Sequence, residues 1–190
     1  MRKIIAILFV LLGFFSCKTK QTKGVFHDQT IEAFDTVTVS SAVDSSMRNL
    51  VQTGLFNLER ISNSFYFSKQ FKKRFSHSIL ITDISDFRVS SFDVIKRTHD
   101  DEMLKWAGRR PFSEIEFLVV FGALFKMNQT GKVIFLTNRT PNIFHVRTTD
   151  GFSVAVDVWY QDGQWCFNAR PLNSSWISGG RVFMRRKFDR

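Results

Sequence analysis

The sequence has few of the residues that build metal and catalytic centres. Its 190 residues include two cysteines and four histidines. No C-x-x-C pair and no H-x-x-x-H spacing occurs among them, which excludes the common zinc-binding patterns. The chain also lacks a G-x-G-x-x-G loop, a Walker loop and a G-x-S-x-G turn. We therefore expect no metal ion and no cofactor, and the enzyme classes that those motifs mark gain no support.

The apolar run at the start of the chain is too short to cross a membrane. Residues 4–15 contain no charged or hydrogen-bonding side chain, whereas a membrane-spanning helix needs about 20 apolar residues. Arg2 and Lys3 precede this run. A short apolar stretch after a positive start is typical of a secretory signal, so we predict that residues 1–16 are a signal peptide.

Cys17 stands at the end of this segment. Small Ser16 precedes it, and polar residues follow. Residues 1–24 resemble a bacterial lipoprotein precursor of the Bacteroides type, whose signal tolerates the bulky Phe14 and Phe15 before the cysteine. The resemblance implies cleavage before Cys17, lipid on its sulfur and acylation of the new amino terminus.

The alternative is an ordinary secretory signal with an incidental cysteine. In an oxidising compartment Cys17 would then be expected to pair with Cys166. Lipid on Cys17 instead leaves Cys166 alone, as a small buried hydrophobe. More than one lipid chain holds a protein firmly to a bilayer, and we predict that residues 17–30 are the lipidated tether. Lysines after Cys17, without acidic residues, favour the periplasmic face of the outer membrane.

The chain is basic, with a net charge of +10 that falls to +8 once residues 1–16 are removed. A positive surface favours anionic partners. In the cell envelope these would be lipid headgroups, lipopolysaccharide, anionic glycans or an acidic protein partner, and we expect no nucleic acid there. The alternative is that the charge only keeps the domain soluble.

Residues 31–190 are expected to form one α+β domain. Loose alternation predicts a strand over 31–40, and three-and-four spacing of apolar residues predicts an amphipathic helix over 45–61. A short buried strand is expected over 79–84 and a helix over 90–108. Ser113 and Glu116 form a capping box before an apolar stretch at 117–125, which predicts a buried helix. A strand at 117–121 is the alternative.

Alternation with period two dominates after Gly131. Five strand-like segments follow, at 132–138, 142–148, 152–160, 164–170 and 181–186. Asp150-Gly151 and Asp162-Gly163 are dipeptides favoured by tight hairpin turns. We therefore predict N-terminal helices packed on a C-terminal antiparallel β-meander of four to five strands. The layout resembles the nuclear-transport-factor-like cone, a likeness that does not settle function.

Two groups of residues are candidate binding surfaces. Basic residues fall between Phe67, Phe71 and Phe75, namely Lys69, Lys72, Lys73 and Arg74. Aromatic residues interleaved with bases occur in membrane-surface helices and in nucleic-acid-binding strips, although a helix with one core face has the same pattern. Trp159, Trp165 and Trp176 could stack on sugars or enter a partner, or they could close one end of the core.

Two groups of residues are candidates for acid–base chemistry or metal binding. His145 and Asp157 are placed to share one sheet face, where such a pair could act as a general base. The alternative is a solvent-exposed strand face, which gives the same pattern without chemistry. His99 opens the cluster His99-Asp100-Asp101-Glu102, which could hold a cation or an acid/base pair. The alternative is that these acidic residues complement the dipole of a helix start.

Three functions are consistent with these patterns. The first is a non-enzymatic, membrane-anchored lipoprotein that binds another component of the cell envelope. The second is a small periplasmic hydrolase that uses His145 and Asp157, or the His99 cluster. The third is an immunity or phage-exclusion lipoprotein.

Overall fold

The computed structural model describes residues 18–20, 31–39, 64–75, 87–106, 108, 110–129 and 135–186. The helices of this part are α4 (Lys69–Arg74), α5 (Asp100–Trp106) and α6 (Glu114–Gln129). Its strands are β1 (Lys18–Lys20), β2 (Ile31–Val39), β3 (Phe65–Phe67), β4 (Phe87–Val94), β5 (Thr98–His99), β6 (Phe112–Ser113), β7 (Asn142–Arg147), β8 (Ser153–Gln161), β9 (Gln164–Pro171), β10 (Ser175–Trp176) and β11 (Arg181–Arg186). The predicted signal peptide, Cys17, the predicted helix at 45–61 and the predicted strand at 79–84 lie outside the described residues.

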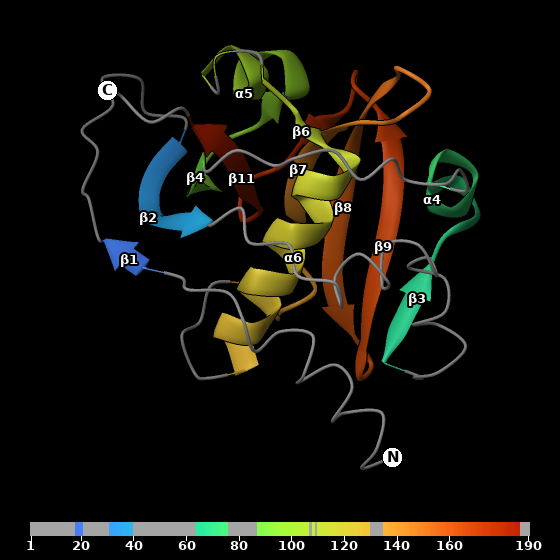
Figure 1. Ribbon diagram of the computed structural model, residues 1–190, viewed down its shortest axis with the longest axis horizontal. Coiled ribbons are helices and arrows are strands. Elements are labelled where there is room, and N and C mark those ends of the chain that lie inside the picture. The colour runs from blue at the N-terminus through green and yellow to red at the C-terminus, as the bar shows by residue number, and fades with distance from the viewer. Residues whose placement is uncertain are drawn as a thin grey trace.

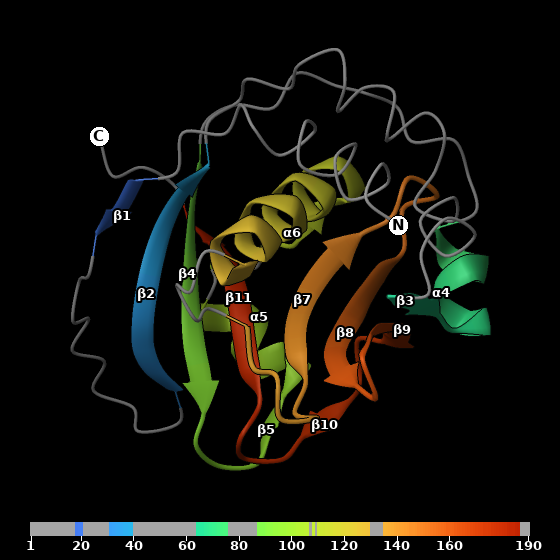
Figure 2. The same cartoon turned by 90° about the horizontal axis from the view of Figure 1, so that it is seen from below.

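Most of the described strands form one mixed sheet that curves around α6 (Figures 1 and 2). Its order is β1-β2-β4-β11-β7-β8-β9-β3, with β6 beside β7. The contacts of β7 with β11 and β6, and of β3 with β9, are parallel, and the others are antiparallel. A separate two-stranded antiparallel sheet consists of β5 and β10. The α+β class is confirmed.

The prediction that the C-terminal strands form a simple antiparallel meander is wrong. Strands β7, β8 and β9 do form consecutive antiparallel neighbours. The chain then leaves the sheet through β10, and β11 returns on the other side of β7, parallel to it and antiparallel to β4. Alternation identifies a strand but not the sheet edge that the strand will join, so it could not predict this crossing.

Two predicted elements are replaced by other structure. The predicted helix at 90–108 is a helix only in α5, because residues up to Val94 belong to β4. The predicted strand at 132–138 is not a strand in its described part, residues 135–138. There the side-chain amide of Asn142 exchanges two hydrogen bonds with the backbone of Leu136, at 2.9 and 3.0 Å, which takes the place of ladder bonds.

The buried residues of the described part form two cores, one on each face of the sheet. The larger core lies between the concave face and α6 and consists largely of phenylalanine. Within it, Phe144 of β7 and Phe183 of β11 stack at 4.8 Å with nearly parallel rings. The smaller core lies on the opposite face, where Met103 of α5 and Trp176 of β10 cover Ile143 and Val182.

The start of α6 confirms the predicted capping box. The backbone N–H of Ser113 donates to Oε2 of Glu116 at 2.8 Å, and the backbone N–H of Glu116 donates to Oγ of Ser113 at 3.3 Å. These reciprocal bonds satisfy donors that a helix start leaves without partners. The apolar stretch at 117–125 is helical and mostly buried, as predicted. No helix in the described part of the chain is long and apolar enough to span a membrane.

Candidate functional site

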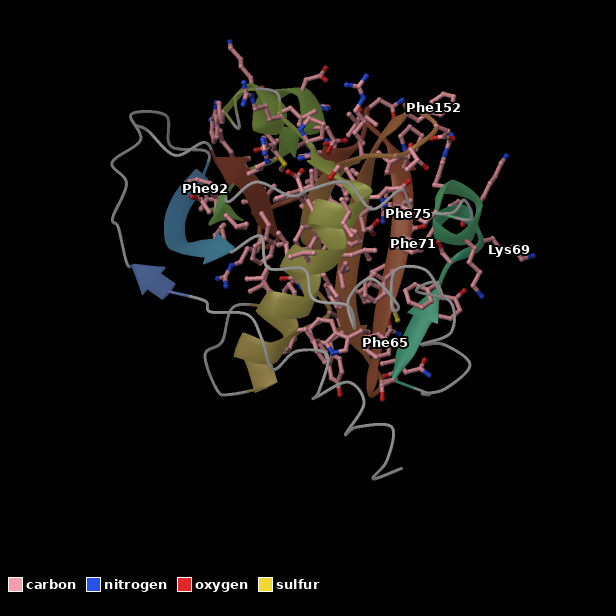
Figure 3. The ribbon with its side chains drawn as sticks, in the orientation of Figure 1. Phe65, Lys69, Phe71, Phe75, Phe92 and Phe152 are labelled. Atoms are coloured by element: carbon pink, nitrogen blue, oxygen red, sulfur yellow. The ribbon has the colours of Figure 1, made fainter. Side chains whose placement is uncertain are left out.

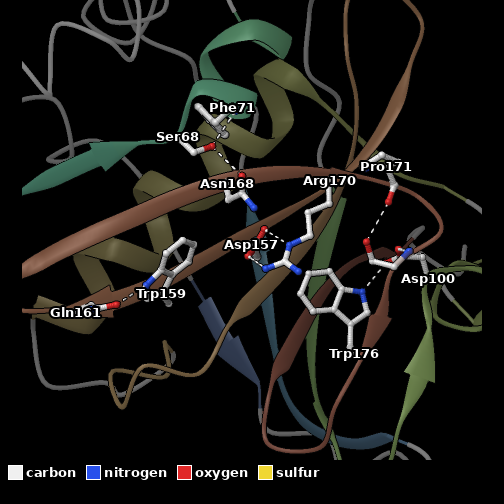
Figure 4. Close-up of polar contacts among 11 residues, drawn as sticks. Ser68, Phe71, Asp100, Asp157, Trp159, Gln161, Asn168, Arg170, Pro171 and Trp176 are labelled. Carbon is white, nitrogen blue, oxygen red and sulfur yellow. Dashed lines mark hydrogen bonds and ion pairs between the residues drawn. The ribbon is translucent and has the colours of Figure 1, made fainter.

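Asp100, the first residue of α5, is a fully buried carboxylate that receives hydrogen bonds from two other parts of the fold. Its Oδ1 accepts from Nε1 of Trp176 at 2.7 Å and lies 2.8 Å from Nε2 of His145. Its Oδ2 accepts from the backbone N–H of Ser174 at 2.9 Å. Figure 4 shows the contact with Trp176. We call these four residues the Asp100 clamp, because they fasten α5 and β10 to β7.

The burial of His145 decides what the clamp can do. Its side chain is 3% exposed, and that of Asp100 is 0% exposed. An ionised carboxylate only accepts hydrogen bonds, so Nε2 of His145 is assigned as the donor. A general base must reach the proton that it removes from a substrate. Since neither group reaches solvent, this arrangement fits a structural role better than catalysis.

His145 and Asp157 lie on the same sheet face but do not form a pair. His145 stands opposite Ala155, and Asp157 stands opposite Ile143, so the two are diagonal neighbours across β7 and β8. Asp157 instead binds Arg170 of β9 in a two-pronged ion pair. Nη2 of Arg170 donates to Oδ2 at 2.9 Å, and Nε donates to Oδ1 at 3.2 Å (Figure 4).

Arg170 links this ion pair to the Asp100 clamp. Its guanidinium carbon lies 5.3 Å from the centre of the Trp176 ring, in a cation–π contact. Burial raises the pKa of Asp157 above its ordinary value of 3.8, and the hydrogen bond and charge of Arg170 oppose that rise. No pattern in the sequence singles out Arg170. The turn at Asp162-Gly163 sets Asn168 opposite Asp157, so the β8–β9 register would have placed Arg170 on the same face.

Replacing Arg170 with glutamine is expected to raise the pKa of Asp157 further, because the variant removes the main influence that opposes burial. The folded pKa already exceeds the unfolded one, so folding binds a proton in the window above pH 3.8. Stability therefore falls as pH rises through that window, and the fall should be larger in the variant.

Carbon-13 NMR titration of the Asp157 carboxyl measures the pKa in the variant and in the wild type. Arg139→Gln, which changes an exposed pair with Asp162, is the control, and an unchanged or lower pKa in Arg170→Gln contradicts the assignment.

The remaining residues of the His99 cluster do not share the burial of Asp100. His99, Asp101 and Glu102 are exposed, and the two carboxylates lie in the first turn of α5, where they complement the helix dipole. Asp101 and Glu102 also line a hollow of about 500 Å³, together with Leu104 and Lys105. Among the described residues, no group of three His, Cys, Asp or Glu side chains is close enough to hold a metal ion.

The three tryptophans do not share an exposed face. Trp165 is buried in the larger core and Trp176 in the smaller one, on opposite sides of the sheet. Trp159 is partly buried, and its Nε1 donates to Oε1 of Gln161 at 3.2 Å. A single platform that stacks on sugars is therefore absent from this group, and two of its members complete the cores.

The basic segment forms α4 at the β3 edge of the sheet, where the aromatic residues and the bases separate. Phe71 and Phe75 stack at 4.3 Å and are buried. The side-chain oxygen of Ser68 caps the helix by accepting from the backbone N–H of Phe71 at 3.1 Å. The helix contributes four bases, of which Lys69 and Lys73 are exposed, while Lys72 and Arg74 are partly buried. Hence α4 carries a core face and a charged surface face.

Cys166 lies mid-strand in β9 and forms no disulfide. Burial, with a smaller contribution from the charge of Asp162, raises the pKa of its thiol above the ordinary value of 9.0. A raised pKa leaves little thiolate at neutral pH, and thiolate is the reactive form. Cys166 thus fits packing better than chemistry.

Comparison with protein-family models, with curated proteins and with solved structures gave no match.

Proposed function

We propose that this chain is a lipid-anchored protein of the cell envelope that binds an anionic component on the periplasmic face, and that it works by binding instead of catalysis. The anchor in this proposal is Cys17, and the outer membrane is the membrane that the lysines after it favour. The binding surface is the basic face of α4.

One observation carries the preference for binding. In the described residues, the side chains best suited to acid–base chemistry are engaged in contacts that hold the fold together. His145 is bound to buried Asp100, and Asp157 is bound to Arg170. The bases of α4 lie on a helix without acidic residues in its first turn, and the helix is fixed to the core by Phe71.

A hydrolase remains the second candidate, because His145 and Asp100 lie at the 2.8 Å separation that a catalytic acid–base pair would have. This function would require the cover formed by β10 to open and admit a substrate. A hydrolase of this kind would lose all activity in His145→Gln. A binding protein would instead keep its ligand in every His145 variant that folds.

Labelling with a fatty acid in the native bacterium tests the anchor. Wild-type protein and Cys166→Ala should incorporate the label, and Cys17→Ser should not, because only Cys17 is proposed to carry lipid. Cys166→Ala is the matched control, since it removes the chain's other thiol. Label on Cys17→Ser, or none on the wild type, would contradict the proposal.

A further inference from the structure

Phe152 is an exposed aromatic residue beside the basic helix. It lies at the start of the β8 strand region, directly after the turn at Asp150-Gly151, and 56% of the residue is exposed. The guanidinium carbon of Arg74 in α4 lies 4.8 Å from the centre of its ring. Figure 3 shows Phe152 near the end of α4 that Phe75 marks, at the surface of the domain.

The turn fixes Phe152 in this exposed position. The backbone N–H of Thr148 donates to the carbonyl oxygen of Phe152 at 2.7 Å, and the hydroxyl oxygen of Thr148 lies 2.8 Å from the same carbonyl oxygen. Gly151 has a positive φ of 86°, and its N–H donates to the carbonyl of Thr148 at 2.9 Å. Thr149, which follows Thr148, donates its N–H to Oε1 of Glu114 at 2.9 Å, and this bond ties the turn to α6. The ring is therefore presented to solvent by an ordered turn.

Basic residues lie on the elements next to the ring. Arg74 stacks on it, the other bases of α4 follow on the same short helix, and Arg147 is exposed on the β7 strand that leads into the turn. Two carboxylates lie at this turn: Asp150 of the turn accepts a hydrogen bond from the hydroxyl of Thr148, and Glu114 of α6 accepts one from the backbone N–H of Thr149. Among the described residues of this surface, the four bases of α4 and Arg147 outnumber these two carboxylates.

We propose that Phe152 and the bases of α4 form a docking surface for an anionic phospholipid bilayer. In this arrangement the ring enters the boundary between headgroups and acyl chains, while Lys69, Lys73 and Arg74 bind headgroup phosphates. An apolar side chain flanked by bases is the combination that interfacial membrane binding uses. A bilayer accounts for the bases and for the exposed ring together. An acidic protein would bind the bases as well, and binding to polyglutamate distinguishes it.

The proposal rests on the proposed function, because it assumes a domain held at an envelope membrane. Lys18, next to the proposed anchor, belongs to β1, and β1 and β3 stand at opposite edges of the sheet order. The helix α4 follows β3 directly. A lipid at one edge and the docking surface at the other would hold the domain at two points and so fix its orientation on the bilayer.

Vesicle co-sedimentation tests this surface without the anchor. The protein is the mature polypeptide from residue 17 onward, unlipidated and carrying Cys17→Ser. Vesicles of phosphatidylcholine alone are compared with vesicles that also contain phosphatidylglycerol. We expect binding only to the anionic vesicles, weakened by added salt.

Two variants and two matched controls locate the contact. Phe152→Ala should weaken binding roughly tenfold through lost apolar burial, and Lys69→Glu should weaken it by about fivefold or more through lost charge. Ile177 is 68% exposed and Lys96 is also exposed. Ile177→Ala and Lys96→Glu repeat each change on the surface near β5 and β10, and they should bind like the parent protein.

Several outcomes would overturn the inference. These are absence of binding, equal binding to neutral vesicles, or losses in the two controls but not in Phe152→Ala and Lys69→Glu. Binding to polyglutamate but not to vesicles would assign the surface to an acidic protein. Because the protein is unlipidated, these results are independent of fatty-acid labelling: vesicle binding can fail while Cys17 is labelled, and the reverse.

Discussion

Replacement of Asp100 with alanine is expected to lower the free energy of unfolding by about 3–5 kcal/mol, because two buried donors and one partly buried donor lose their acceptor. The variant leaves Nε2 of His145, Nε1 of Trp176 and the N–H of Ser174 without their acceptor. Each buried donor without a partner costs about 1–3 kcal/mol. Urea unfolding of the variant, followed by circular dichroism, measures the change.

Asp101→Ala is the matched control. Asp101 is the next residue of α5, is exposed, and lies in the same first turn. It interacts mainly with the helix dipole, so its loss should cost less than about 1 kcal/mol. Similar effects of the two substitutions would mean that the Asp100 clamp does not hold α5 and β10 to the sheet.

Phe167→Ala is expected to destabilise the protein by about 3–5 kcal/mol, through lost apolar transfer and the cavity that remains. Phe167 of β9 is fully buried in the larger core. Its ring centre lies 4.8 Å from that of Phe67 and 5.6 Å from that of Phe71, so it joins β3 and α4 to the sheet. On the other side it meets Phe121 of α6 at 4.9 Å, edge to face. Urea unfolding again gives the value.

The control is the same substitution at Phe152. That ring is exposed and stacks with Arg74, so its removal should cost less than about 1 kcal/mol. If Phe167→Ala cost no more than Phe152→Ala, the phenylalanine core would not be the main support of α4. The comparison also establishes that the Phe152→Ala protein used with vesicles is folded.

Local patterns in the sequence predicted the parts of the fold that depend on neighbouring residues. The capping box of Ser113 and Glu116 needs only residues three apart, and the structure contains it. In β8, alternation with period two sets Val154, Val156 and Val158 on one face, and these residues do lie in the larger core. The same alternation sets Phe152 on that face, but Phe152 is exposed, because it precedes the strand and belongs to the turn.

Contacts between distant residues could not be predicted in this way. Asp100 and His145 are 45 positions apart, and Asp100 and Trp176 are 76 apart. The sequence placed Asp100 in an acidic cluster and His145 beside Asp157, and nothing local indicated that the first two would meet. Only the return of β10 to pair with β5 brings Trp176 and Ser174 over Asp100.

The helix wrongly predicted over 90–99 has a physical cause in the sequence. Ser90 and Ser91 are residues that can cap a helix, and charged residues follow them. In the structure Val89 lies in the larger core, while Phe92 and Val94 lie in the smaller one. This part of the sheet is covered on both faces, so its strand lacks the clean alternation that would identify it.

The most direct test of the central claim is the mass of the amino-terminal peptide of the protein isolated from its native membranes. The account predicts a peptide that begins at Cys17 and carries lipid on the sulfur and an acyl group on the amino nitrogen. A peptide that begins at any other residue, or an unmodified Cys17, would contradict it.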